Sequence, residues 1–198
     1  MTSPSLSGRV DAVVIGTSAG GVEALSQVLP VLPADCRVPV MVVIHLPRER
    51  PSLLADIFRQ KCALRVIEAQ DKEAIAPGTV YFAPPDYHLL VDDGPSLALS
   101  DDELVNFSRP AIDVLFESAA ECYRHRLCGV LLTGASHDGA AGLAAIRRAG
   151  GVTIVQQPET AHAATMVEAA LKKGPVDHVL TLADLASLLL TLDRGPAS

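Results

Sequence analysis

Three polar residues stand directly after apolar runs of this sequence, and their types could perform chemistry together. Ser18 lies in "IGTSAGG", His45 ends the run in "VVIHLP", and Asp138 lies in "GASHDGAAG". A hydroxyl, an imidazole and a carboxylate are the parts of a nucleophile, of the base that takes its proton, and of the anion that fixes the tautomer of the base. If the runs are parallel strands, their carboxyl ends meet at the edge of the sheet where α/β proteins bind ligands. The pattern therefore predicts a catalytic triad at that edge.

Each of these residues also has an ordinary structural explanation. A serine in a Gly-rich turn can cap a helix, and an aspartate before glycine is common in turns. A histidine at the end of a strand can simply be hydrogen-bonded in the core. Turn and cap chemistry does not require all three residue types at one edge, so their convergence favours the catalytic interpretation.

The Gly-rich turn itself permits a second hypothesis, a phosphate cradle. A dinucleotide site needs G-x-G-x-x-G and an acidic residue after the second strand. Here Ser18 stands where the middle glycine is needed, Gly20 and Gly21 are out of place, and the second strand ends on His45. No Lys-Ser/Thr pair follows the glycines as in a Walker loop. Phosphate binding is therefore the less favoured hypothesis.

The same turn matches G-x-S-x-G, the nucleophile elbow of α/β-hydrolases. That fold places several strands before its serine and orders the triad as serine, acid, histidine. Only one strand can precede Ser18, and the order here is Ser18, His45, Asp138. The local device is shared while the fold differs. Backbone N–H groups at the start of the following helix, at Ala19 and Gly20, are expected to stabilise an oxyanion.

Short apolar runs alternate with helical segments along the chain, which is typical of strands buried on both faces of a parallel sheet. We therefore predict an α/β fold with a doubly wound, mostly parallel sheet, helices on both faces and a small antiparallel hairpin at one edge. The hairpin is expected within 79–100, where Pro and Gly turns separate three short runs. The expected strands are 10–15, 38–44, 64–69, 129–133 and 152–156, and the expected helices are 22–28, 52–61, 111–124, 140–149, 165–172 and 182–192.

Composition limits the classes of function. The 198 residues, 49% of them apolar, suit one domain, expected over 1–198 with an ordered core at about 10–192. A net charge of −7 argues against nucleic-acid or anionic-membrane partners, and no apolar run approaches the roughly 20 residues that span a bilayer. The four cysteines lack CxxC spacing and predict buried, reduced thiols in a cytoplasmic protein. Neither they nor the histidines show the spacing of a metal site, so no metal is expected.

Five motifs, in order and spacing, resemble the catalytic domain of the bacterial chemotaxis receptor methylesterases, the CheB-type protein-glutamate methylesterases. They are "IGTSAGG", "IHLP", "PGTVYFAPPDYHL", "SRPAIDVLF" and "LLTGASHDGAAGL". The resemblance covers roughly 11–192. It implies a serine hydrolase without a cofactor that removes γ-methyl esters from glutamates on chemoreceptor signalling helices, releases methanol, and in some members deamidates receptor glutamines. Ser18 would be the nucleophile, His45 the general base and Asp138 its orienting partner.

The sequence departs from the family pattern at three points. Members commonly carry Met where Ala135 stands, although a contribution from its backbone N–H to the oxyanion site would survive the exchange. The segment 162–171 resembles a family "GMPxEA" stretch but lacks its Gly and Pro. Members usually carry a receiver domain ahead of the catalytic one, and this sequence contains none, so it is expected to be an excised domain or a stand-alone form.

Other residues near the expected site are weaker candidates. Arg109, in "SRPAIDVLF", is expected either to cap or cover the surface or to line the substrate groove and meet receptor carboxylates. Arg48 and Arg50 follow His45 and could add positive charge or lie in a solvated loop. Two further hypotheses for the whole chain stay open: a non-catalytic or phosphate-binding regulatory domain, and an esterase whose specificity has drifted.

Overall fold

A computed structural model of the chain describes residues 5–45, 52–94 and 96–193. Its centre is a sheet of seven strands in the order β3-β4-β2-β1-β7-β8-β9, in which every neighbouring pair is parallel. The predicted α/β fold class is confirmed. The strands are β1 (Ala12–Thr17), β2 (Val40–Ile44), β3 (Arg65–Glu68), β4 (Thr79–Phe82), β7 (Leu127–Leu131), β8 (Val152–Gln156) and β9 (His178–Leu180).

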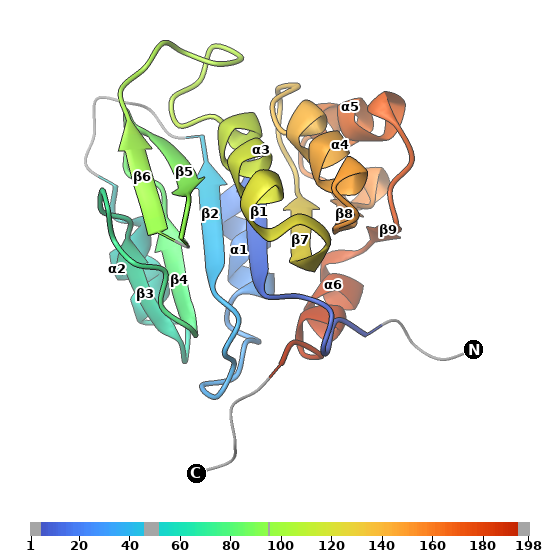
Figure 1. The fold of residues 1–198 in the computed structure, drawn as a ribbon. Coiled ribbons are helices and arrows are strands. Elements are labelled where there is room, and N and C mark those ends of the chain that lie inside the picture. Colours follow the sequence, from blue (N-terminus) through green and yellow to red (C-terminus); the bar gives the residue numbers. More distant parts are fainter. Residues whose placement is uncertain (1–4, 46–51, 95, 194–198) are drawn as a thin grey trace.

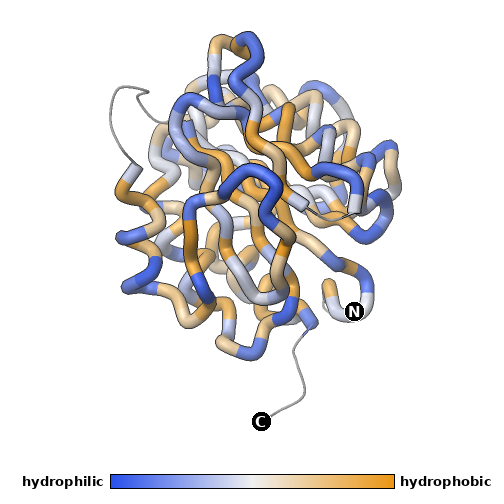
Figure 2. The backbone as a smooth tube through the Cα atoms, turned by 60° about the vertical axis from the view of Figure 1, so that its left-hand side comes forward, coloured by the Kyte–Doolittle hydropathy of each residue, from blue (hydrophilic) through white to orange (hydrophobic). Residues whose placement is uncertain are grey.

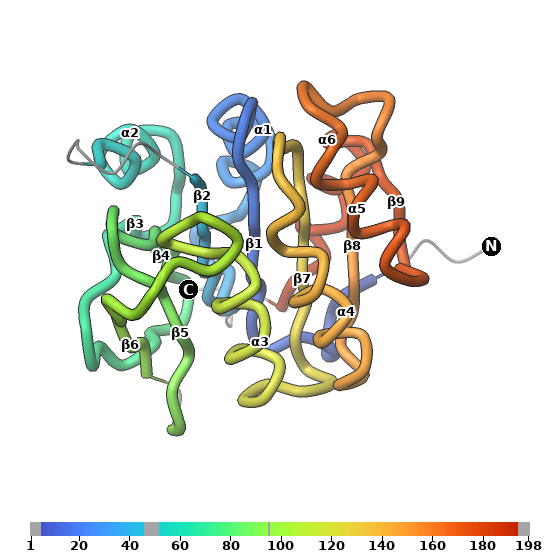
Figure 3. Tube along the Cα trace, turned by 90° about the horizontal axis from the view of Figure 1, so that it is seen from above, coloured from blue at the N-terminus to red at the C-terminus, as the bar shows by residue number. Residues whose placement is uncertain are grey.

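Helices cover both faces of the sheet, which Figures 1 and 3 show from two directions. One face carries α1 (Gly21–Val28), α2 (Leu54–Arg59) and α6 (Leu182–Leu189). The other carries α3 (Ile112–Tyr123), α4 (Ala140–Arg148) and α5 (Thr165–Lys173). Two short 3-10 turns, η1 (Arg124–Arg126) and η2 (Pro158–Thr160), complete the helical segments.

Alternation along each strand divides the core between these two layers. In β1, Val13 and Ile15 face the layer of α1, whereas Ala12 and Val14 face the layer of α3. All six residues of β1 are buried because both faces of the sheet are covered, which explains why the sequence shows continuous apolar runs. Figure 2 shows the hydrophobic segments running through the interior, with hydrophilic turns at the periphery.

The segment 79–100 differs in detail from the sequence-based expectation. Its first run is β4, a parallel strand that lies between β3 and β2 in the main sheet. Only β5 (His88–Asp92) and β6 (Ser96–Ser100) form the antiparallel pair, and they make a separate two-stranded sheet that packs beside α3. The turn Pro84-Pro85-Asp86 therefore carries the chain from the main sheet to the layer above it rather than to an adjacent strand. Strand β9, with three residues, was not expected.

The sheet is wound in both directions from β1. The chain adds β2 and then the β3–β4 pair on one side, and returns to add β7, β8 and β9 on the other. The loops after β1 and β7 therefore diverge to opposite faces, and the crevice between them is where such sheets bind ligands.

A close approach between β1 and α3 generates the first prediction. A Cβ at Gly16 would overlap Cγ2 of Ile112, the first residue of α3, with Cδ1 only 3.0 Å away. We expect Gly16→Ala to lower the free energy of unfolding by about 1–3 kcal/mol, because the overpacked helix must shift. Urea denaturation measures the change. Gly174→Ala is the matched control, since a Cβ there meets no atom within 4 Å; equal effects of the two substitutions would contradict the packing argument.

Candidate active site

Ser18 lies in the turn between β1, the central strand of the sheet, and α1. Its N–H donates to Thr133 O at 2.9 Å, and its carbonyl accepts from the N–H of Gly21 at the same distance. Gly20 has a φ of 80°, a left-handed conformation that glycine adopts at little cost and that turns the chain sharply into the helix. The sequence thus forms the expected strand–turn–helix, and Ser18 is half-buried at its apex.

His45 is held beside this turn by the pairing of β1 with β2. The last paired residues are Thr17 and Ile44, and the N–H of His45 donates to Thr17 O at 3.2 Å. Ser18 and His45 therefore occupy equivalent positions, each one residue beyond its strand. Within the part of the chain that the structure describes, no hydrogen bond of Ser18 Oγ is present.

Asp138 reaches the same edge from the other side, through the turn that follows β7. Its side chain is fully buried, and its Oδ2 lies 2.8 Å from Nε2 of His45. Two residues that lie 93 positions apart are thus joined by one short hydrogen bond. The predicted meeting of imidazole and carboxylate is present in the structure.

Three further donors fix the Asp138 carboxylate. The backbone N–H of Ile112 donates to Oδ2 at 2.6 Å, and that of Asp113 donates to Oδ1 at 3.1 Å. The Nδ2 of Asn106 donates to Oδ1 at 2.8 Å. The two backbone groups belong to the first turn of α3, where the helix dipole also favours a negative charge.

The electrostatic balance keeps this buried group ionised. Burial by itself raises the pKa of Asp138, but the hydrogen bonds from His45, Ile112 N, Asn106 and Asp113 N outweigh it and hold the pKa below its usual value. An ionised carboxylate can only accept a hydrogen bond, so the nitrogen that faces it, Nε2 of His45, must carry the hydrogen. In neutral His45 the lone pair then lies on Nδ1, the other ring nitrogen.

Three backbone N–H groups on the turns next to Ser18 are the candidates for the predicted oxyanion site. Among the described residues, the N–H groups of Ala19, Gly20 and Ala135 have no hydrogen-bond acceptor. The turn 17–20 is tied to Thr133, whose Oγ1 donates to Ala19 O at 2.9 Å. The expected donors therefore lie on two loops that are joined to each other.

Gly134 lets these two loops approach closely. A Cβ at this position would lie 3.0 Å from Cβ of Ser18 and 2.5 Å from Cε of Met166. The N–H of Met166 donates to Gly134 O, and the N–H of Gly134 donates to Ala163 O, both at 3.0 Å. In space, Gly134 therefore lies between Ser18 and the first turn of α5, and a side chain at this position would not fit.

Both the sequence and the fold of this chain are similar to those of known proteins. A sequence profile described as CheB methylesterase matches residues 13–189. The chain belongs to the CheB methylesterase family.

Relatives in this family align over most of the chain. A putative protein-glutamate methylesterase/protein-glutamine glutaminase of Leptospira interrogans is 45% identical over 185 residues, which are 93% of this chain and 96% of the relative. A protein-glutamate methylesterase/protein-glutamine glutaminase of Anaeromyxobacter dehalogenans is 41% identical over 97% of this chain but only 56% of its own length. The crystal structure of the Thermotoga maritima CheB methylesterase catalytic domain is similar with a TM-score of 0.87 and 34% identity, and covers 91% of this chain and 97% of that one.

The segment 162–171, which departs from the family pattern, lies directly at the site. Its His162 packs on Gly20, where a Cβ would lie 2.5 Å from that of His162. The N–H of Ala163 donates to Oγ1 of Thr133 at 2.9 Å, and its carbonyl accepts from the N–H of Gly134, just before α5 begins at Thr165. A surface next to Ser18 is therefore built from residues that lack the family Gly and Pro, and Ala135, the other departure, is exposed beside it.

Arg109 is engaged within the protein. Its Nε and Nη2 donate to Oδ1 of Asp86 at 3.1 and 2.9 Å, and its Nη1 donates to the carbonyls of Asp101 and Asp102. It also lines a hollow of about 660 Å³ together with Glu103, Leu104, Asn106 and Phe107. These contacts show that Arg109 fixes the loop before α3; a contact with substrate carboxylates stays a prediction. Arg48 and Arg50 lie outside the described residues.

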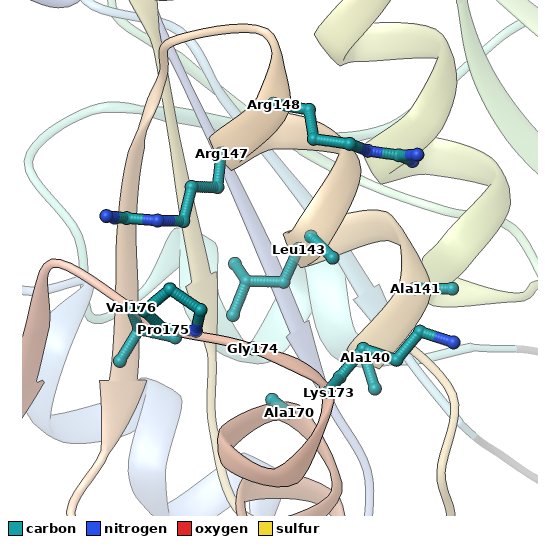
Figure 4. A pocket seen from close by; sticks show the side chains of 11 residues that line it. Ala140, Ala141, Leu143, Arg147, Arg148, Ala170, Lys173, Gly174, Pro175 and Val176 are labelled. Carbon is teal, nitrogen blue, oxygen red and sulfur yellow. The ribbon is translucent and has the colours of Figure 1, made fainter.

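A second cavity, of about 500 Å³, lies between α4 and the end of α5. Figure 4 shows the side chain of Leu143 directed toward Pro175 and Val176, with the side chains of Arg147 and Arg148 extending to opposite sides. Arg147 pairs with Asp177 at 2.6 Å. None of the three expected triad residues lines this cavity, so it is separate from the site at the sheet edge.

The described residues contain neither a candidate metal site nor a candidate membrane span. No group of three or more His, Cys, Asp or Glu side chains among them could hold a metal ion. No helix there is long and apolar enough to cross a membrane.

Sequence reasoning missed two residues of this site, Asn106 and Asp113. Asp113 stands within "SRPAIDVLF" and is buried beside Ile112 in the first turn of α3, so a charged residue on the buried side of an amphipathic helix was a usable signal. Asn106 precedes the helix on an irregular loop, and nothing in its local sequence marks it.

The ionised state of Asp138 generates a prediction about stability. We expect Asp138→Asn to lower the free energy of unfolding by about 2 kcal/mol or more at neutral pH. The four donors now share two carboxylate oxygens, whereas an amide has only one acceptor oxygen and leaves some of these donors without a partner. The folded pKa of Asp138 lies below the unfolded value of about 3.9, so its stabilisation is fully present above about pH 4 and is lost as the pH falls through the folded value. The difference between wild type and variant should therefore shrink in acid.

Urea denaturation at pH 7 and at about pH 3 measures this difference. Asp35→Asn, at an exposed position, is the control and should leave the free energy of unfolding unchanged at neutral pH. A difference for Asp138→Asn that stays constant or grows in acid would show that the carboxylate is not held ionised by its donors.

Proposed function

We propose that this protein is a serine hydrolase that removes γ-methyl esters from glutamates on the cytoplasmic helices of methyl-accepting chemoreceptors. Family membership supports the reaction class, because relatives carry the name protein-glutamate methylesterase/protein-glutamine glutaminase. The single observation that carries the mechanism is the 2.8 Å hydrogen bond between His45 Nε2 and the buried carboxylate of Asp138. His45 follows β2 at the position level with Ser18, which follows the neighbouring strand β1. The proposed setting is the cytoplasm.

The first half-reaction uses Nδ1 of His45 as the base. Because Nε2 donates to Asp138, the lone pair on Nδ1 accepts the proton of Ser18 Oγ as that oxygen attacks the ester carbonyl. The imidazolium that forms is stabilised by the ionised Asp138. This assignment of ring nitrogens is the reverse of the chymotrypsin arrangement, in which Nδ1 faces the aspartate.

The tetrahedral intermediate carries its negative charge next to the N–H groups of Ala19, Gly20 and Ala135, which have no acceptor among the described residues. His45 then gives its proton to the departing methoxide, so methanol leaves and an acyl-serine remains. Water, deprotonated by the same imidazole, releases the glutamate carboxylate and restores Ser18. Deamidation of a glutamine follows the same steps with ammonia in place of methanol.

Removal of the nucleophile tests this proposal directly. With receptor carrying labelled methyl esters, we expect Ser18→Ala to release methanol about 10⁴-fold more slowly than wild type or worse, because the covalent route is lost. Ser187→Ala, an exposed position on α6, is the matched control and should behave as wild type.

Two outcomes separate the alternatives. If wild type releases no methanol from any methylated receptor but binds phosphate at the turn after β1, the regulatory hypothesis gains support. If Ser18→Ala keeps wild-type activity, the proposed mechanism is wrong whatever the substrate.

Substitutions at Ala135 test the proposed oxyanion site. Ala135→Pro deletes the backbone N–H, and we expect kcat to fall about 10²–10³-fold, the usual cost of one oxyanion donor. Ala135→Met keeps the N–H and restores the residue common in the family, so its kcat should stay close to that of wild type. Thermal unfolding of both variants controls for misfolding. A folded Ala135→Pro variant with unchanged kcat would remove this group from the mechanism.

A further inference from the structure

Asn106 lies on an exposed loop, and its side-chain amide reaches inward to two buried carboxylates. The loop is closed by paired backbone bonds between Val105 and Ser108, at 3.2 and 2.9 Å. Asn106 has a φ of 51°, in the left-handed region that Asn tolerates better than most residues. The next residue, Phe107, is 95% exposed, whereas the Asn106 amide is directed toward α3 and Asp138.

One nitrogen of Asn106 joins two buried carboxylates. Its Nδ2 donates to Oδ1 of Asp138 and to Oδ2 of Asp113, each at 2.8 Å. The Asp138 carboxylate, which its donors keep ionised, only accepts hydrogen bonds, so the nitrogen rather than the oxygen of the Asn106 amide must face it. Both hydrogens of this nitrogen are used.

We propose that Asn106 is a positioning residue for the esterase reaction: its amide fixes the rotation of the Asp138 carboxylate and so the direction in which Oδ2 meets His45. The inference rests on the proposed role of Asp138 as the partner of the catalytic base. Nothing in it requires Asn106 to contact the substrate.

The distribution of donors on Asp138 explains why this amide matters. Oδ2 receives His45 Nε2 and the N–H of Ile112, at 2.8 and 2.6 Å. Oδ1 receives Asn106 Nδ2 and, more weakly, the N–H of Asp113 at 3.1 Å. Without Asn106, the weaker bond alone would hold Oδ1, and the carboxylate plane could rotate away from the imidazole.

Asp113 locks the amide from its other side. Its Oδ1 accepts the N–H of Gly142 at 2.6 Å, which anchors it to the first turn of α4, while its Oδ2 accepts Asn106. In Asp113→Asn, the new amide would keep its oxygen on the N–H of Gly142. Its NH₂ group would then face the NH₂ group of Asn106, and two donors cannot bond to each other. The Asn106 amide would then have to turn, so this variant should reproduce the kinetic defect of an Asn106 variant.

Among the described residues, few charged groups lie around the pair. Besides His45 on Asp138, Glu117 lies on the same helix as Asp113, and Arg148 of α4 acts on Glu117. The pKa of Asp113 is raised overall, because burial and the neighbouring Asp138 charge outweigh the hydrogen bonds from Gly142 and Asn106, which lower it. Because Asn106 stabilises the charged form of both carboxylates, its removal should raise the pKa of each.

Asn106→Gly is the decisive variant, because glycine keeps the left-handed backbone while deleting the amide. We expect kcat for ester hydrolysis to fall about 10–100-fold with KM unchanged, since misplacement of a catalytic group by about 1 Å costs on this order. In protein labelled with ¹³C at aspartate carboxyls, the Asp138 signal should titrate at higher pH than in wild type. Lys72→Gly, at another left-handed position (φ 60°) on an exposed turn, is the matched control and should change neither.

A serine-reactive phosphonate that titrates active sites separates positioning from folding. Full titration of Asn106→Gly with reduced kcat supports the inference, as does a similar kcat defect in Asp113→Asn. A kcat within twofold of wild type, a change in KM alone, or a loss of activity that matches a loss of titratable sites would overturn it. The ¹³C titration does not depend on the substrate, so an unchanged Asp138 signal would refute the coupling even if methanol release failed for wild type.

Discussion

One buried negative charge organises the catalytic edge of this protein. The Asp138 carboxylate has no exposure to solvent and accepts hydrogen bonds from the imidazole at the end of β2, from a loop amide and from two N–H groups of α3. A buried charge without partners would cost several kcal/mol, so each donor must be delivered to within bonding distance. The positions of α3, of the loop before it and of the end of β2 are therefore mutually constrained by one group.

Glycines make these approaches geometrically possible. Gly16 lets α3 lie against β1 so that Ile112 N reaches Asp138, and Gly139, with a φ of 92°, turns the chain from that aspartate into α4. Gly142 brings α4 against α3, where its N–H meets Asp113. The close contact of α3 and α4 thus belongs to the same arrangement as the site: the fold positions the carboxylate, and the bonds of the carboxylate in turn hold the two helices together.

The sequence predicted the parts of this arrangement that follow from strand order and strand ends. Continuous apolar runs indicate strands buried on both faces, and residues that follow parallel strands must share an edge, so the meeting of His45 and Asp138 could be inferred from the residues alone. The role of 79–82 could not, because a short apolar run before a tight turn is equally compatible with a hairpin strand and a central parallel strand. The role of Asn106 could not either: its amide contacts Asp113 and Asp138 only because an irregular loop folds back, and loop conformation leaves no periodic trace in sequence.

Two departures from the family pattern, Ala135 and the segment 162–171, lie close to Ser18. Ala135 stands on the same loop after β7 as Asp138, and the segment 162–171 contacts the turns of the site where His162 packs on Gly20 and Met166 on Gly134. The expected base and its partner contribute side chains: His45 is held by strand pairing, and Asp138 is held by buried hydrogen bonds from α3 and the loop before it. Ala135, in contrast, is expected to contribute a backbone N–H, which most side chains would leave in place. Side chains next to Ser18 can therefore differ between family members while the groups expected to carry the reaction stay the same.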